Sequence, residues 1–432
     1  MQKAVKKLIK ILKWSCIIIL GMNIILLIVR FIGKMYYKRT PEGGINESMY
    51  LDVNGQEQWI SIYGENKDNP VMLFLHGGPG DTYSYADFHV LRKLAKDYTV
   101  VNWDQRNAGK TWVHNAQDSE ITPELMRSDL ETLTDQILEY TGKDKLTLLG
   151  LSWGTLYADD FALRHPEKAE CVIDLSIAIR AGIYTEQMRQ DARDYCDGLL
   201  SYDDIIAKYG YYGYDFFCCT ENDELGITEP ADIQKMNEGV KQVYLEWTAD
   251  DPELHAMAEQ FDTELLTQAL LDPENESLYE AYKEYDFPIY SKISAKYGDQ
   301  IHFGRQINIF EADFGLLSSV WCNPYYTLPE LCRILTYDYE NNSYSDKIEM
   351  LCDDFAQTLK DNTEYRMPFY VLQGDHDDPI GIIRNYYDSV TAPDKDFRYL
   401  ENGGHSSTLL RSEELAAFVH EIAEKQQDPD CS

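Results

Sequence analysis

A serine flanked by two glycines is the first residue of the chain that could act as a nucleophile. Residues 150–154 read Gly-Leu-Ser-Trp-Gly, after an apolar run at 146–149 and before a helical pattern that begins at Trp153. This context predicts a strand-turn-helix elbow that exposes the hydroxyl of Ser152 above a sheet. The backbone N–H of Trp153 could then help to hold an oxyanion at the helix N-terminus. A serine in an ordinary glycine-flanked turn is the simpler alternative.

A nucleophilic serine needs a histidine base and a carboxylate that orients the base, in chain order Ser, Asp, His for such an elbow. Residues 374–378 read Gly-Asp-His-Asp-Asp after a predicted strand. We predict Asp377 as the acid, because its spacing from the glycine turns it back to the sheet edge. Asp378 is the second choice, a solvated turn is the alternative, and His376 is expected to be a neighbour of the acid. His405, after the last predicted strand, is the predicted base, with a plain loop histidine as the alternative.

Consecutive glycines follow the first buried strand, where residues 76–80 read His-Gly-Gly-Pro-Gly. Without a Cβ, the amide of Gly77 or Gly78 can approach a substrate oxygen, and we predict it as the second oxyanion donor. No G-K-[ST] follows, so the loop does not fit a phosphate site. The chain has no C-x-x-C spacing for a structural zinc, and the predicted chemistry requires no metal or cofactor.

Strands and helices alternate in the segments that carry these residues. Residues 50–63 predict a hairpin with a type I′ turn at Asn54-Gly55, and 71–75 and 98–103 predict strands. Residues 122–141 predict a helix that ends at Gly142. Such alternation predicts a parallel sheet. It stops from about 185 to 361, a Tyr-rich and mostly helix-like stretch with 32 acidic against 10 basic residues between 185 and 345, and returns at 368–374.

Composition narrows the class of protein. The chain has 432 residues, 44% hydrophobic and 12% aromatic, which excludes a disordered or fibrous chain. The first 40 residues carry nine basic side chains and no acidic one, which leaves 30 basic against 74 acidic groups in the remainder. Such a body repels phosphates, so nucleic acid is excluded as a partner.

A membrane anchor is predicted at the N-terminus. Residues 14–29 are sixteen uncharged residues, and 11–32 supply the ~20 residues that a spanning helix needs. A cleaved signal peptide would need small residues after the apolar run, and Arg30-Phe31-Ile32-Gly33 offers no such site. The short basic N-terminus favours an inside position, so we expect a single-pass protein of the cell membrane with its body outside the cytoplasm.

Three motifs together resemble the proline iminopeptidase family of serine α/β-hydrolases. Residues 76–80, 102–110 and 150–154 stand in that family's order and spacing. Asp129, His165-Pro166 and the segment 179–184 also match it. The resemblance implies an α/β-hydrolase fold, a mostly parallel doubly wound sheet with an inserted helical cap. The division would be an anchor at 1–40, a core at 41–184 and 362–432, and a cap at 185–361.

The resemblance also implies an activity. Ser152, Asp377 and His405 would form the triad of a serine peptidase that releases the N-terminal residue, often proline, from short peptides. An esterase or amidase that acts on small non-peptide acyl substrates is the alternative. A membrane-tethered binding protein that keeps the fold without catalysis is the third possibility, and the complete set of Ser, Asp and His speaks against it.

The chain departs from the family at the positions that would bind the substrate's free amine. Family members hold the free amine with cap glutamates, and here Thr248 stands where one would fall, with Glu246 two residues away. Ser294 stands near the other position. We predict Glu246 as the substrate-binding carboxylate that remains. In the family's D-Q-R-G-x-G-x-S loop, Asn107 replaces a Gly and Thr111 replaces a Ser.

Overall fold

The computed structural model describes most of the chain. The described residues are 2–80, 82, 84–115, 118–178, 186–209, 216–217, 225–272, 275, 277–278, 280–281, 314–336, 343–345, 347–375, 377, 380–401 and 403–427. Four predictions lie outside these residues: His376, Asp378, Ser294 and the segment 179–184.

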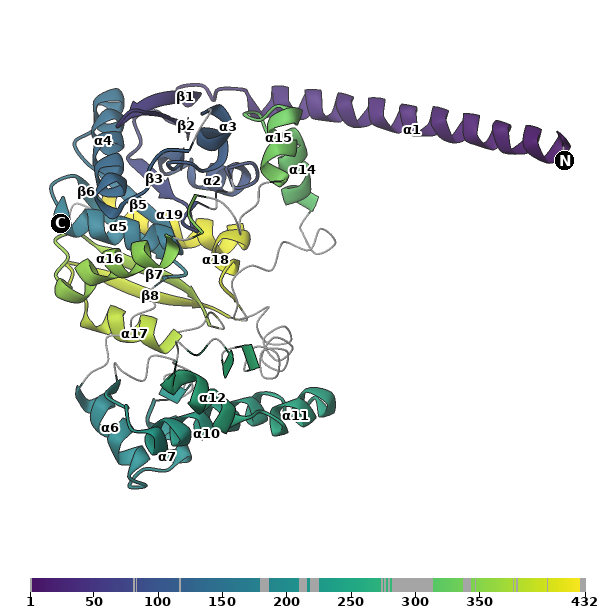
Figure 1. Ribbon diagram of the computed structural model, residues 1–432. Helices are drawn as coiled ribbons and strands as arrows, with labels where there is room; N and C mark the ends of the chain where they lie inside the picture. Colours follow the sequence, from purple (N-terminus) through teal and green to yellow (C-terminus); the bar gives the residue numbers. More distant parts are fainter. Residues whose placement is uncertain are drawn as a thin grey trace.

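An eight-stranded sheet forms the centre of the molecule (Figure 1), in the order β1-β2-β4-β3-β5-β6-β7-β8. β1 and β2 form an antiparallel hairpin and β2 pairs antiparallel with β4, whereas all later pairs are parallel. The strands are β1 (Ile45–Val53), β2 (Gln56–Gly64), β3 (Val71–Leu75), β4 (Thr99–Asp104), β5 (Leu146–Leu151), β6 (Ala169–Leu175), β7 (Phe369–Gly374) and β8 (Lys395–Leu400). This topology confirms the predicted fold class, a mostly parallel α/β-hydrolase sheet.

Local sequence explains two of the sharpest turns. Asn54 and Gly55, between β1 and β2, have φ of 49° and 81°, the left-handed pair that a type I′ turn requires. Helix α4 (Pro123–Thr141) begins after Thr122, whose hydroxyl accepts from the N–H of Leu125 at 3.2 Å. It ends at Gly142, whose φ is 66°. Both turns lie where the sequence predicts them.

Helices cover both faces of the sheet and divide its core. Along β3, Leu73 and Leu75 face one layer, and Met72 and Phe74 face the other. The first layer contains α4, α5 (Trp153–Arg164), α16 (Ile348–Asp361) and α17 (Ile380–Ser389). The second contains α2 (Phe88–Leu94), the short α18 (Ser407–Leu410) and α19 (Ser412–Gln427). The predicted catalytic residues Ser152, Asp377 and His405 follow the carboxyl ends of β5, β7 and β8.

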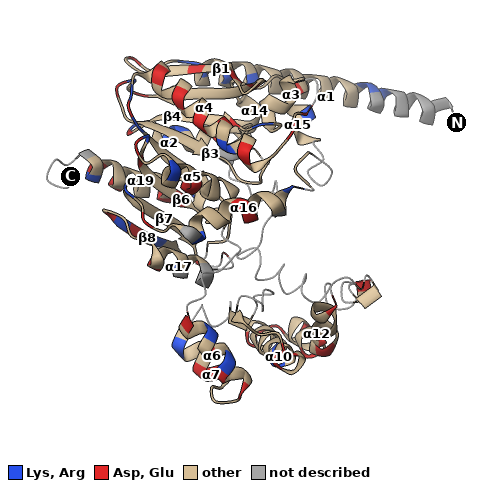
Figure 2. Cartoon of the chain, turned by 60° about the vertical axis from the view of Figure 1, so that its left-hand side comes forward, with Lys and Arg blue, Asp and Glu red and all other residues tan. Residues whose placement is uncertain are grey.

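The stretch predicted as an insertion contains two groups of helices. Helices α6 (Glu186–Cys196), α7 (Tyr202–Tyr209), α10 (Pro230–Trp247), α11 (Pro252–Glu259) and α12 (Thr263–Leu271) form a helical lobe below the sheet in Figure 1. In contrast, α14 (Phe314–Cys322) and α15 (Leu328–Leu335) lie beside α2 and α3 (Gly109–His114), and α16 packs on α5. The helical lobe is therefore the part of residues 185–361 that lies farther from the sheet, although its buried side chains belong to the same hydrophobic cluster as the first layer. Figure 2 shows acidic residues, in red, on α4 of the core as well as on α12 of the lobe.

Helix α1 (Gln2–Tyr37) projects away from the body (Figure 1). Its residues Lys13–Tyr37 are long and apolar enough to cross a membrane, and almost none of this stretch is buried in the protein. By length and composition alone, a signal sequence passes the same test.

Candidate active site

The predicted elbow forms at the junction of β5 and α5. Ser152 lies between them with φ 54° and ψ −123°, a strained conformation for a residue with a Cβ. A Cβ at Gly154 would lie 2.0 Å from the carbonyl oxygen of Leu75, and a Cβ at Gly150 would lie 2.6 Å from that of Gly154. Both glycines are therefore required by close backbone contacts, which explains the Gly-x-Ser-x-Gly pattern physically.

The His-Gly-Gly loop lies directly against Ser152. A Cβ at Gly77 would be 3.2 Å from the Cβ of Ser152 and 3.7 Å from its Oγ, so the backbone of Gly77 borders the serine side chain. Gly78 follows with φ 114°, which favours glycine. Trp153 is the first residue of α5, where helix amides have no intrahelical partner. The three residues predicted as oxyanion donors therefore lie around Ser152, and their role as donors stays a prediction.

His405 and Asp377 form a hydrogen-bonded pair. The Nδ1 of His405 lies 2.9 Å from Oδ1 of Asp377, and both side chains are largely buried. The second carboxylate oxygen, Oδ2, accepts from Nε2 of Gln373 at 2.6 Å. Asp377 thus has the contact with the base that its predicted role needs.

Three consecutive residues at the end of β6 connect the predicted nucleophile, base and acid. The carbonyl of Leu175 accepts from the N–H of Ser152 at 3.0 Å. The hydroxyl of Ser176, which has φ 51°, donates to the carbonyl of His405 at 2.6 Å. The N–H of Ile177 donates to Oε1 of Gln373, which in turn binds Asp377. The end of β6 therefore positions all three predicted catalytic residues from one short backbone segment.

A second network connects the glycine loop to the elbow. The N–H of Gln105 donates to Nε2 of His76 at 3.2 Å, so Nδ1 carries the proton and donates to the carbonyl of Gly77 at 2.8 Å. The side chain of Gln105 donates to the carbonyl of His76 and accepts from Nε1 of Trp153, both at 3.2 Å. Complete burial lowers the pKa of His76 to about 4, so its ring is neutral at physiological pH and acts as a fixed spacer between the loops.

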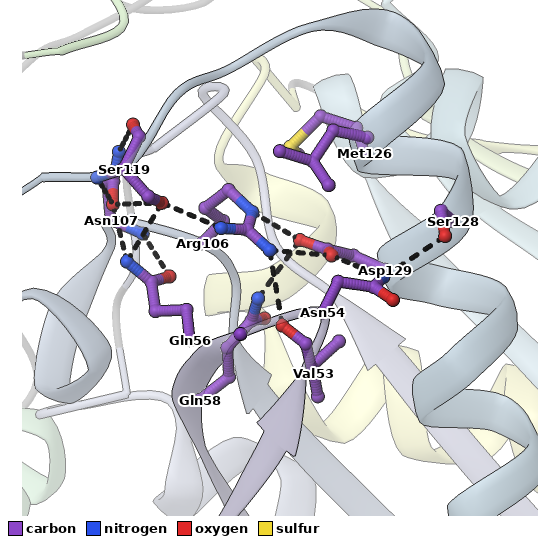
Figure 3. A network of polar contacts seen from close by, with 12 residues as sticks. Val53, Asn54, Gln56, Gln58, Arg106, Asn107, Ser119, Met126, Ser128 and Asp129 are labelled. Atoms are coloured by element: carbon purple, nitrogen blue, oxygen red, sulfur yellow. Dashed lines mark hydrogen bonds and ion pairs between the residues drawn. The ribbon is translucent and has the colours of Figure 1, made fainter.

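Arg106 and Asp129 form a buried ion pair under this loop (Figure 3). The guanidinium donates from Nε to Oδ2 at 2.6 Å and from the terminal NH2 to Oδ1 at 2.8 Å. The carboxylate also accepts from the side chains of Asn54 and Gln58, each at 2.9 Å. Both carboxylate oxygens of Asp129 therefore accept hydrogen bonds. This bidentate ion pair holds the loop that carries Gln105 in place.

The two departures in this loop preserve its structure. Asn107, where the family has Gly, adopts φ 54°, and asparagine tolerates the left-handed region better than most residues. Thr111, where the family has Ser, keeps a hydroxyl that donates to the carbonyl of Asp104 at 2.6 Å. Neither substitution removes a contact of the loop.

Glu246 lies in the helical lobe, exposed near the C-terminal end of α10. Thr248 is buried and donates its hydroxyl to the carbonyl of Tyr244 at 2.7 Å, so it caps the end of this helix. The hydroxyl of Thr248 also lies 3.2 Å from Nδ1 of His255 within the lobe. Recognition of an amine by Glu246 stays a prediction.

Sequence reasoning missed the residues that hold the site together. Gln373 is the polar residue within an otherwise apolar strand, and Ser176 follows directly after a buried strand. A buried polar side chain needs a partner, so these positions in the pattern could have indicated a role at the sheet edge. Among the described residues, no group of three or more His, Cys, Asp or Glu side chains is placed to hold a metal ion.

Comparison with known proteins concerns the fold and part of the sequence. Residues 70–193 match the family model described as alpha/beta hydrolase fold. The chain is 32% identical over 117 residues to a probable aminopeptidase of Bacillus subtilis (strain 168), and 35% identical over 125 residues to a proline iminopeptidase of Clostridioides difficile (strain 630). These matches cover 27% and 28% of this chain, and 37% and 39% of those relatives, so the chain spans less than half of their length.

Two solved structures are similar to the chain at low sequence identity. A proline iminopeptidase of Mycobacterium smegmatis superposes with a TM-score of 0.46 and 15% identity, covering 88% of this chain and 98% of that one. A carboxylesterase of Bacillus subtilis gives 0.42 and 14%, covering 92% and 96%. At these values neither likeness bears on activity. The chain has the α/β-hydrolase fold, and over part of its length its sequence is similar to those of proline iminopeptidases and a related aminopeptidase.

Proposed function

We propose that this chain is a membrane-anchored serine hydrolase that releases N-terminal residues from short peptides. The observation that carries the proposal is the 2.9 Å pairing of His405 with Asp377, tied through the end of β6 to the elbow that presents Ser152. Buried histidine-carboxylate pairs beside a strained serine are the arrangement that nucleophilic acyl transfer needs.

The proposed mechanism follows from the contacts. Asp377 holds Nδ1–H of His405, so Nε2 is the nitrogen that takes the proton from Ser152 as its Oγ attacks the substrate carbonyl. The amides of Trp153 and of Gly77 or Gly78 stabilise the oxyanion. His405 then protonates the leaving group, and water releases the acyl group from the serine. Neither step requires a metal or cofactor.

Two classes of substrate are candidates for this site: peptides with a free N-terminal amine and small acyl compounds. The aminopeptidase assignment is supported by the similarity to proline iminopeptidases and by Glu246, a carboxylate of the helical lobe that could bind a cationic amine. The second candidate is an esterase or amidase for small acyl substrates. It is favoured by Thr248, which stands where the family has a carboxylate and whose buried hydroxyl is bonded to the helix backbone instead.

The location in the membrane is the second part of the proposal. Residues 11–32, most of which belong to the apolar stretch Lys13–Tyr37, would cross the cell membrane once, with the N-terminus in the cytoplasm and the catalytic body outside. Retention of α1 in the mature chain, rather than cleavage as a signal peptide, is tested by N-terminal sequencing of the membrane-bound protein. Digestion of intact cells with an added protease tests the sidedness, because an external body is degraded without cell lysis.

The decisive assay compares four substrates: a prolyl arylamide, its N-blocked twin, other aminoacyl arylamides and a short acyl ester. The full-length protein is assayed with Ser152→Ala and with Ser48→Ala, an exposed serine on β1, as the matched control. We expect Ser152→Ala to lower kcat by several orders of magnitude and Ser48→Ala to leave it unchanged.

Each result assigns the function differently. A preference for free-amine substrates supports the aminopeptidase. Equal or faster cleavage of the blocked amide and the ester identifies the esterase or amidase. Near-normal turnover by Ser152→Ala would contradict the mechanism. Absence of both turnover and labelling by a serine-directed phosphonate would identify a binding protein that lacks catalysis.

A further inference from the structure

Helix α1 contacts the body through α14. The indole Nε1 of Trp321 donates to the carbonyl of Leu26 at 2.9 Å, and the thiol of Cys322 lies 3.8 Å from the carbonyl of Val29. A Cβ at Gly33 would lie 2.3 Å from Sγ of Cys322, so only glycine allows this approach. Thus α14 packs closely against the last third of the predicted membrane span.

The first charged residue after the uncharged run, Arg30, is hydrogen-bonded through this contact. Arg30 is only 6% exposed, and its guanidinium donates to the carbonyl of Trp321 and, at 2.7 Å, to that of Tyr326. The ammonium of Lys34 donates to the same carbonyl of Tyr326 at 2.5 Å. Carbonyls at the end of α14 and in the following turn therefore accept from the cations that end the apolar run of α1.

These contacts fix the depth of α14. Leu26 lies one helical turn, about 6 Å, before Arg30 along α1, on the side of the hydrocarbon core. A side chain bonded to the Leu26 carbonyl therefore lies at the boundary where tryptophan collects in membrane proteins. The sequence of α14, Phe-Gly-Leu-Leu-Ser-Ser-Val-Trp-Cys, has no charged residue, which suits such a position. The neighbouring surface of α1 remains apolar and exposed, with Leu26 and Val29 near half exposure.

The body is coupled rigidly to this pair of helices. The side chain of Asn323 donates to the carbonyls of Ser84 and Tyr85, at 3.1 and 2.9 Å, in the loop that continues from the glycines beside Ser152. The hydroxyl of Tyr326 lies 2.5 Å from Oγ of Ser84. At the end of α1, Arg92 donates to the carbonyl of Tyr37 at 2.6 Å. The anchor is thus bonded to the core rather than joined by a free linker.

We propose that α14 is a second membrane-contacting element, which lies in the lipid interface beside α1 and holds the body against the bilayer. The partner is the phospholipid bilayer itself. This inference rests on the proposed membrane span, and the experiment is arranged so that failure of one is distinguished from failure of the other.

The test is quenching of tryptophan fluorescence by lipid. The full-length protein is reconstituted into phosphatidylcholine and phosphatidylglycerol vesicles, with and without phosphatidylcholine brominated on its acyl chains. Trp321→Phe, Trp14→Phe in the span and Trp247→Phe in the helical lobe are compared with the wild type. A fourth variant, Val320→Trp, adds a reporter in α14 without removing the Trp321 contact.

We expect the lipid-quenched signal to fall in Trp14→Phe and Trp321→Phe, to rise in Val320→Trp and to stay unchanged in Trp247→Phe. If the lipid-quenched signal falls in Trp14→Phe but does not change in Trp321→Phe or Val320→Trp, the proposal for α14 is overturned. The proposed membrane span of α1 would then still hold. No change in any of the variants would show that α1 does not enter the bilayer, and both proposals would fall.

Discussion

The catalytic core and the helical lobe place their functional side chains in opposite ways. In the core, Ser152, Asp377 and His405 are held by buried neighbours that each make two or more bonds, and one segment at the end of β6 reaches all three. In the lobe, Glu246 is exposed on a helix that packs against other lobe helices. Under the proposed function, the chemical step depends on buried contacts in the core, whereas substrate preference depends on a surface that can change without disturbing them.

The largest effect is expected where the core orients the base. Asp377→Asn keeps the shape of the side chain but replaces one carboxylate oxygen with an NH2 donor. Because Nε2 of Gln373 donates to one of the two positions, the remaining oxygen of the amide would accept from Gln373 and the NH2 group would face Nδ1 of His405. The wrong imidazole tautomer is then favoured, and we expect kcat to fall by roughly 10³–10⁴-fold. The measurement is steady-state hydrolysis of the best substrate, with Asp68→Asn on the surface as the control. Loss of less than tenfold would mean that another carboxylate orients the base.

The next effect concerns stability. Asp129→Asn leaves the guanidinium of Arg106 buried with its charge uncompensated, because a neutral amide with a single acceptor oxygen replaces the carboxylate that binds it. We expect the free energy of unfolding to fall by about 3–5 kcal/mol. Urea unfolding followed by far-UV circular dichroism measures it. The matched change in the lobe, Asp251→Asn at the start of α11, keeps a good helix cap and should alter stability only slightly.

A third prediction concerns two buried carboxyl groups, those of Asp159 on α5 and Asp174 on β6. They contrast with the carboxylate of Asp129, which is paired with Arg106. Burial raises the pKa of Asp159 to about 7, and burial together with the charge of Asp159 raises the pKa of Asp174. From about pH 4 to pH 7 the folded chain keeps a proton on Asp159 that the unfolded chain releases, so stability falls as pH rises through this window.

Asp159→Asn removes that proton uptake. We expect the variant to lose less stability than the wild type as pH rises from about 5 to about 7, and the two profiles to run parallel above that range. Melting temperatures across this range provide the measurement. Parallel pH profiles of variant and wild type would show that Asp159 titrates normally in the folded protein.

The core could be predicted from sequence because its signals are local. Gly150 and Gly154 mark close backbone approaches, and apolar runs mark buried strands, so the elbow and the glycine loop are visible within a few residues. The pairing of Asp377 with His405 follows from their places after two adjacent parallel strands. In contrast, Ser176 and Gln373 act through residues distant in the chain, and α14 meets α1 across almost 300 residues of sequence. Such contacts depend on tertiary packing, which no local pattern encodes.

The smallest effect tests the lobe itself. Glu246→Gln removes one negative charge from an exposed position, so its effect on stability should stay within about 0.5 kcal/mol. If this carboxylate binds the substrate's amine, KM for free-amine arylamides should rise by up to about tenfold while kcat changes little, since the lost contact is made equally before and during the reaction. The ester and the N-blocked arylamide should be unaffected. Glu253→Gln, an exposed carboxylate on α11, is the control. Equal KM changes in both variants would indicate a general effect of charge, and unchanged KM in both would remove Glu246 from the site and leave selectivity to other parts of the chain.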